Sequence, residues 1–86
     1  MLKDKIALVT GGSRGIGSSI CKELAKAGAT VLINYANSKD SALKVLEEIV
    51  EGRGKGEVIG FDVSDYSIVE EKIKYLIEKY EKIDIL

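Results

Sequence analysis

The sequence has 86 residues, with 13 Lys and Arg against 14 Asp and Glu, and a formal net charge of −1 at pH 7. This balance excludes the basic surface that nucleic acid or an anionic membrane would require. A single cysteine, Cys21, and the lack of histidine exclude an internal disulfide framework and a zinc-type ligand cluster. No apolar run is long enough to span a membrane. We expect one small domain, residues 1–86, in the reducing environment of the cytoplasm.

A glycine-rich segment follows the first apolar run. Residues 6–10 are apolar enough for a buried parallel strand, and a helical pattern starts at Ile16. Between them stands the motif Thr10-Gly11-x-x-x-Gly15-x-Gly17. Glycines let the backbone turn tightly near a ligand, and the unpaired N–H groups of a helix start stabilise an anion. The order of strand, glycine turn and helix predicts a dinucleotide site; the alternative is an ordinary glycine turn.

The first helix is expected to bury one apolar stripe and to end at Gly28 in a left-handed cap. The stripe is predicted to be Ile16, Ile20, Leu24 and Ala27. Cys21 lies beside it and is interpreted as a small core residue, because the chain has no histidine to activate a thiol. A second β-branched, apolar strand is expected at residues 30–34.

Two further helices are expected after the second strand. Ser38 or Asn37 is placed to cap the second helix, and Ser64 to cap the third, with Asp65 in its first turn. The buried stripe of the second helix is predicted to be Ala42, Val45, Leu46, Ile49 and Val50. That of the third is predicted to be Ile68, Val69, Ile73, Leu76, Ile77 and Tyr80.

The remaining segments complete an alternation of strands and helices. Residues 52–56 are interpreted as a flexible connection, residues 57–61 as a third strand, and residues 83–86 as the start of a fourth. Alternating strands and helices predict a doubly wound α/β fold with a parallel sheet. Right-handed crossovers give the strand order 3-2-1, with the fourth strand beside the first. The first two helices should then cover one face of the sheet and the third the other.

The glycine motif resembles that of the short-chain dehydrogenase/reductase family. The opening residues 5–17, Lys-Ile-Ala-Leu-Val-Thr-Gly-Gly-Ser-Arg-Gly-Ile-Gly, look most like the 3-oxoacyl-[acyl-carrier-protein] reductases within it. The resemblance covers all 86 residues but only the N-terminal, cofactor-binding part of such an enzyme. It implies a Rossmann-type βαβαβα fold, cut before the Asn-Asn-Ala-Gly stretch that follows a segment like residues 83–86. No catalytic residue is therefore expected among these 86.

The resemblance and the residues together predict the cofactor. The loop residues expected to hold it are Thr10, Gly11, Ser13, Arg14, Gly15, Ile16 and Gly17. The end of the second strand lacks the acidic residue that would hold a ribose 2′-OH and repel a 2′-phosphate. Arg14 can pair with that phosphate, and Asn37 and Ser38 can donate hydrogen bonds to it. NADP is thus the predicted cofactor. In the alternative interpretation, Arg14 is an exposed charge of the loop and does not contact a cofactor.

Asp62 and Val63 follow the third strand, at the edge where open α/β sheets bind ligands. By resemblance, Asp62 would accept a hydrogen bond from the adenine amine and Val63 would flank the ring. The alternative is that Asp62 only helps to start the following helix.

Two Tyr-x-x-x-Lys spacings match the catalytic pair of the family. Tyr35 and Lys39 straddle a strand end and a helix start, and Tyr75 and Lys79 lie on the third helix. Both are interpreted as chance matches, since i,i+4 neighbours are common on helices. The true pair is expected beyond these residues.

Several functions remain open at this point. The resemblance implies the NADP-binding part of a reductase that transfers hydride from NADPH to a 3-oxoacyl thioester in fatty acid biosynthesis. It also implies acyl-carrier protein as partner and a homo-oligomer, a tetramer, for the complete enzyme. The alternatives are a non-catalytic dinucleotide-binding module or isolated fragment, and another short-chain dehydrogenase acting on a sugar or a steroid-type alcohol.

Overall fold

The computed structural model describes residues 2–12 and 15–84, which form a sheet of three parallel strands and three helices. In chain order the elements are β1 (Ile6–Val9), α1 (Gly15–Lys26), β2 (Thr30–Tyr35), α2 (Lys39–Glu51), β3 (Lys55–Gly60) and α3 (Tyr66–Tyr80). Within the described ranges, no helix has both the length and the apolar character needed to cross a bilayer.

The sheet confirms the predicted topology. β2 is the central strand of the three and pairs in parallel with β1 on one side and β3 on the other. Its register with β3 extends from Thr30 opposite Lys55 to Tyr35 opposite Gly60. β3 thus starts two residues earlier than predicted, because Lys55 and Gly56 already pair with β2 instead of forming a flexible connection.

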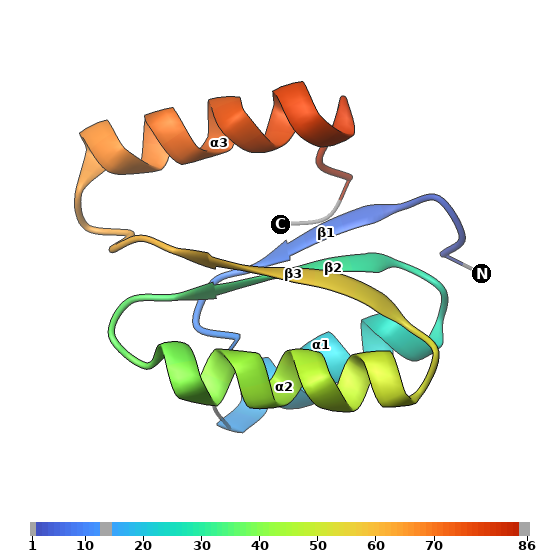
Figure 1. Cartoon of the computed structure of the whole chain (residues 1–86). Coiled ribbons are helices and arrows are strands. Elements are labelled where there is room, and N and C mark those ends of the chain that lie inside the picture. The colour runs from blue at the N-terminus through green and yellow to red at the C-terminus, as the bar shows by residue number, and fades with distance from the viewer. Residues whose placement is uncertain (1, 13–14, 85–86) are drawn as a thin grey trace.

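Helices cover both faces of the sheet, as predicted. α1 and α2 pack on one face and α3 on the other (Figure 1). Alternate residues of the strands point to the two faces. Side chains facing α1 and α2 include Ala7, Val31 and Ile33, whereas Leu8 and Leu32 face α3. All five are almost completely buried, so β1 and β2 have an apolar core on each side.

The phase of α1 differs from the prediction. Gly17, Cys21 and Ala25 follow one another at a spacing of one turn, and the last two are buried. The first half of the expected stripe is turned outward, with Ile16 81% exposed and Ile20 46% exposed, whereas Leu24 is partly buried against the core. The small side chains lie beneath because the helix start is packed directly against the glycine loop, where a larger residue would not fit.

The stripes of the other two helices are confirmed only in part. In α2, Ala42, Val45 and Ile49 are buried, whereas Val50 is 57% exposed. In α3, Leu76 is buried and Ile77 is 45% exposed. Each exposed side chain lies at the border of its stripe, one residue beyond a buried one.

The cap of α3 also differs from the prediction. Asp65 is the N-cap, and its carboxylate accepts a hydrogen bond from the N–H of Ile68 at 3.3 Å. Ser64 bonds instead to the carboxylate of Asp62. Ser38 does occupy the N-cap position of α2, but without a side-chain capping bond, and Gly28 has the expected positive φ, +106°.

A fourth strand is not formed within the described residues, although the chain returns to the correct edge. The N–H of Asp84 donates to the carbonyl of Ile6 at 2.9 Å, and its carboxylate accepts from the N–H of Ile6 at 2.8 Å. The neighbouring carbonyl of Lys5 bonds to Thr30 of β2. Since successive residues of a strand point their polar groups to opposite sides, Asp84 lies on the edge of β1 away from β2. Residues 85–86 lie outside the described residues.

Candidate functional site

The glycine loop leaves the carboxyl end of β1 and forms an open backbone cradle. Gly11 and Gly15 have positive φ values of +66° and +52°, a conformation that other residues rarely adopt. A Cβ atom built on either glycine would meet no atom of the described residues, 2–12 and 15–84, within 4 Å. Gly11 and Gly15 therefore present backbone that the described residues leave uncovered next to the first turn of α1, as a phosphate group would require.

The floor of this cradle is tightly packed, in contrast to its open side. A Cβ on Gly17 would lie 2.1 Å from the carbonyl oxygen of Gly11. A Cβ on Gly12 would lie 2.8 Å from the Sγ atom of Cys21. The N–H of Gly12 donates to the carbonyl of Asn34, at the end of β2, at 3.2 Å. Loop, helix and central strand thus fix one another through close backbone contacts.

Cys21 is a core residue, as predicted. Its side chain is fully buried beneath the loop, with Sγ 3.8 Å from the carbonyl oxygen of Gly12. Burial raises the pKa of the thiol to about 11, so the reactive thiolate is disfavoured.

The predicted cofactor residues from three different segments come together at one edge of the sheet. Thr10 follows β1, Asn37 and Ser38 follow β2, and Asp62 and Val63 follow β3. Because the strands are parallel, all three segments lie at the carboxyl edge, beside the glycine loop. Thr10, Ile16 and Asn37 are exposed there. Ser13 and Arg14 lie outside the described residues.

Asp62 is an exposed carboxylate held in a fixed orientation. One of its oxygens, Oδ1, accepts hydrogen bonds from the N–H of Ser64 at 2.9 Å and from its hydroxyl at 2.7 Å. These bonds hold the pKa of Asp62 below its ordinary value, so the group is an acceptor at neutral pH. Its carbonyl also accepts from the N–H of Asp65, the cap of α3. Asp62 therefore does organise the start of that helix, while Val63 beside it stays half exposed.

Asn34 is the functional candidate that the sequence analysis missed. Within the described ranges it is the one buried polar side chain, with 2% of its surface exposed. Its amide donates to the carbonyls of Phe61 at 3.0 Å and Ile59 at 3.3 Å, at the end of β3. The available signal was a polar residue in an otherwise apolar strand.

Of the two Tyr-x-x-x-Lys pairs, the pair on α3 contacts a carboxylate of β3. Lys79 forms an ion pair with Glu57 of β3 at 2.8 Å, and the hydroxyls of Tyr75 and Tyr80 also donate to that carboxylate. This cluster lies near the end of α3, at the sheet edge opposite the glycine loop. Burial and the bond to Glu57 raise the pKa of Tyr80 to about 12.

In the other pair, Tyr35 packs against the sheet and Lys39 does not. A Cβ built on Gly60 would lie 2.7 Å from the ring of Tyr35, which shows how closely the ring covers the end of β3. Lys39 is exposed at the first residue of α2.

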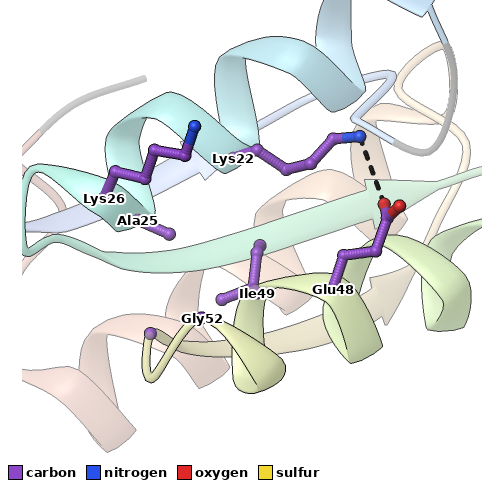
Figure 2. A pocket seen from close by; sticks show the side chains of 7 residues that line it. Lys22, Ala25, Lys26, Glu48, Ile49 and Gly52 are labelled. Atoms are coloured by element: carbon purple, nitrogen blue, oxygen red, sulfur yellow. Dashed lines mark ion pairs between the residues drawn. The ribbon is translucent and has the colours of Figure 1, made fainter.

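A small pocket between α1 and α2 lies away from the predicted site, whereas a larger groove beside α3 reaches it. A small pocket of about 80 Å³ lies between the second half of α1 and the end of α2, where Lys22 pairs with Glu48 at 3.1 Å (Figure 2). It is far below the size of a typical ligand site and lies away from the glycine loop. A groove of about 660 Å³ runs between α3 and β1 and reaches the carboxyl edge at Thr10 and Val63.

Comparisons with known proteins agree with this geometry. The family described as short chain dehydrogenase matches residues 5–86. The chain is 43% identical over 83 residues to the 3-oxoacyl-[acyl-carrier-protein] reductase FabG of Staphylococcus epidermidis, covering 96% of this chain and 34% of the reductase. It is 42% identical over 83 residues to the short-chain dehydrogenase/reductase homolog YusS of Bacillus subtilis, covering 96% of this chain and 76% of the homolog.

A solved structure gives the same result. The crystal structure of a short chain dehydrogenase from Burkholderia cenocepacia in complex with NADP superimposes with a TM-score of 0.88 at 38% identity, over 96% of this chain and 34% of that one. The chain thus spans about a third of the length of this dehydrogenase and of the reductase. The family match extends over nearly the whole sequence, and the chain belongs to the short-chain dehydrogenase family.

Proposed function

We propose that this chain is the NADP-binding part of a reductase that acts on 3-oxoacyl thioesters carried by acyl-carrier protein. The observation that carries the proposal is the open glycine cradle at the carboxyl edge of the sheet, next to a second strand that ends without an acidic residue. The S. epidermidis reductase and the NADP complex from B. cenocepacia support the substrate and the cofactor respectively.

The residues of this chain would bind and orient the dinucleotide. NADPH, when bound, supplies the hydride that reduces the keto group. The backbone at Gly11 and Gly15 leaves room for the pyrophosphate, and the positive end of α1 favours its charge. Asp62 presents an ionised carboxylate to the adenine amine, and Val63 presents an apolar side chain to the ring. Arg14 and the residues Asn37 and Ser38 would hold the 2′-phosphate.

The finer features follow from the same proposal. We infer a cytoplasmic location, consistent with the single buried free thiol. Acyl-carrier protein would be the protein partner and a homo-tetramer the assembly of the complete enzyme. The catalytic groups would come from polypeptide that follows residues like 83–86 in such an enzyme.

A non-catalytic dinucleotide-binding module is the second candidate. One observation favours it: the homolog YusS is not much longer than this chain, which covers 76% of it. A short-chain dehydrogenase for sugars or steroid-type alcohols is the alternative within the enzyme class. An Asn-Asn-Ala-Gly stretch after Leu86 in the gene, followed by Ser and Tyr-x-x-x-Lys, would decide for an enzyme over the module.

The cofactor assignment is tested by replacing Arg14 with alanine. The variant should bind NADPH more weakly by about 1.5–3 kcal/mol, the range for a hydrogen bond to a charged group, with little change for NADH. Arg53→Ala removes the same charge from the loop before β3, at the opposite edge, and is the matched control. Fluorescence titration with both cofactors gives the comparison. An equal loss for NADPH and NADH would contradict the assignment and make Arg14 a solvated loop charge.

A further inference from the structure

The side chain of Asn34 lies in an environment that an apolar residue would suit. The buried residues facing the same side of the sheet include Leu32, Ile59 and Phe61. Burying a primary amide in such a place is costly unless its N–H groups are bonded. In Asn34 the amide donates to the carbonyls of Phe61 and Ile59, and so this position is used to form a link between strands.

This link begins where the strand pairing stops. The register of β2 with β3 ends at Tyr35 opposite Gly60, and Phe61 is one residue beyond it. The Phe61 N–H still reaches the carbonyl of Tyr35, at 3.0 Å, but its own carbonyl lies past the last paired residue. The Asn34 amide supplies a donor to that carbonyl, at 3.0 Å. It therefore fixes the chain immediately before Asp62 and Val63.

The main chain of the same residue fixes the glycine loop. The carbonyl of Asn34 accepts the hydrogen bond from the N–H of Gly12, at 3.2 Å. Gly12 also lies close to α1, since the Sγ atom of Cys21 is 3.8 Å from its carbonyl oxygen and a Cβ atom there would clash with that sulfur. One residue thus holds the floor of the loop through its backbone and the end of β3 through its side chain.

We propose that Asn34 is a positioning residue of the dinucleotide site, which sets the separation between the glycine loop and the segment Phe61-Asp62-Val63. This inference rests on the proposed function. A dinucleotide that contacts both segments needs them at a fixed distance, whereas a ligand that contacts only one does not. Loss of the amide should therefore weaken the binding of the bridging ligand and spare its fragments.

The experiment compares three ligands on the full chain. NADP contacts both segments, adenosine only the end of β3, and inorganic pyrophosphate only the loop. Asn34→Leu removes both donors and approximately keeps the volume of the side chain. Leu32→Ala is the control, because it weakens the same apolar face of the same strand but removes none of the hydrogen bonds that link Asn34 to the loop and to the end of β3. Affinities are measured by NMR titration at a temperature where urea denaturation shows each variant to be folded.

The proposal predicts a selective effect. In Asn34→Leu the dissociation constant for NADP should rise about tenfold or more, while those for adenosine and pyrophosphate stay within about twofold. Leu32→Ala should lower stability and leave the ratios of the three constants unchanged. NADP binding within about twofold of the parent in Asn34→Leu, or a parallel loss for all three ligands, would overturn the positioning role and leave the cofactor assignment standing. A parent chain that does not bind NADP would overturn both.

A milder variant covers the case in which Asn34→Leu does not fold. Asn34→Ser keeps a hydroxyl donor on a shorter side chain. An intermediate rise for NADP alone would support the role, and unchanged ratios would refute it.

Discussion

Replacing Gly17 with alanine should disrupt the cradle, although the change adds a single methyl group. The Cβ atom would lie 2.1 Å from the carbonyl oxygen of Gly11, 2.9 Å from its carbonyl carbon and 3.1 Å from the Cα atom of Gly12. All three are backbone atoms, so no side chain can rotate away. An ordinary contact begins at 3.4 Å, and the loop and the helix must therefore separate by roughly 1.3 Å.

Two effects follow from such a separation. Overpacking of this kind typically costs about 1–3 kcal/mol in the free energy of unfolding. The displaced loop also moves backbone donors away from the phosphate position, and each lost bond to a charged group weakens binding by about 1.5–3 kcal/mol. The affinity for NADP should then fall at least tenfold. The requirement for glycine at this position comes first from the loop itself and only second from the ligand.

The matched control is Gly52→Ala. Gly52 ends α2 with a negative φ of −82°, and a Cβ there would lie 3.6 Å from the nearest atoms, an ordinary contact. This variant should keep the parent affinity and lose no stability. Urea denaturation and cofactor titration of both variants test the argument. Parent-like NADP affinity in Gly17→Ala would refute the packing of the loop as described.

Two further predictions concern other parts of the chain. Glu57→Gln should lower stability only slightly, because the ion pair with Lys79 is exposed, and should not change NADP affinity, because the cluster lies at the opposite edge. Burial alone would raise the pKa of the Glu57 carboxyl, but the bonds from Lys79 and Tyr80 outweigh burial and hold the pKa below 4.5. The difference in the free energy of unfolding between the parent and Glu57→Gln should therefore be full above pH 4.5. It should vanish as the pH falls through the pKa of Glu57 in the folded chain. A constant difference in urea midpoint across that range would contradict this. Residues 1–86 should also self-associate, since within the described residues the groove beside α3 and the side chain of Ile16 are uncovered; a monomer at all concentrations in sedimentation would contradict it.

The order of the sheet was predictable because the strands are buried on both faces. Such strands form short apolar runs, and the residues of β1 and β2 stand out in the sequence for that reason. Handedness then leaves one arrangement for strands joined by helices. The carboxyl-edge location of Thr10, Asp62 and Val63 follows directly from that topology.

The phase of α1 could not be predicted from side-chain size. Periodicity identifies two neighbouring stripes, the large one of Ile16 and Ile20 and the small one of Cys21 and Ala25. Hydrophobicity favours the large stripe. The close backbone contact at Gly17 decides for the small one, since it sets which face of the helix lies on the sheet. That contact is a property of the folded loop and has no counterpart in the hydrophobic pattern.

The role of Asn34 was hidden for a related reason. A polar residue at the end of a strand usually indicates the start of a turn. Here its partners, Ile59 and Phe61, lie more than twenty residues further along the chain and meet it only through the β2–β3 register.

The Tyr75 and Lys79 pair shows that spacing and environment have to agree before a motif implies chemistry. A catalytic tyrosine needs a neighbouring cation that favours its ionised form. Lys79 has the correct spacing, but Glu57 lies against it and also accepts hydrogen bonds from Tyr75 and Tyr80. The carboxylate already pairs with the cation, and burial together with the bond to Glu57 raises the pKa of Tyr80 to about 12. The cluster fastens the end of α3 to β3, at the edge of the sheet that the dinucleotide would not reach.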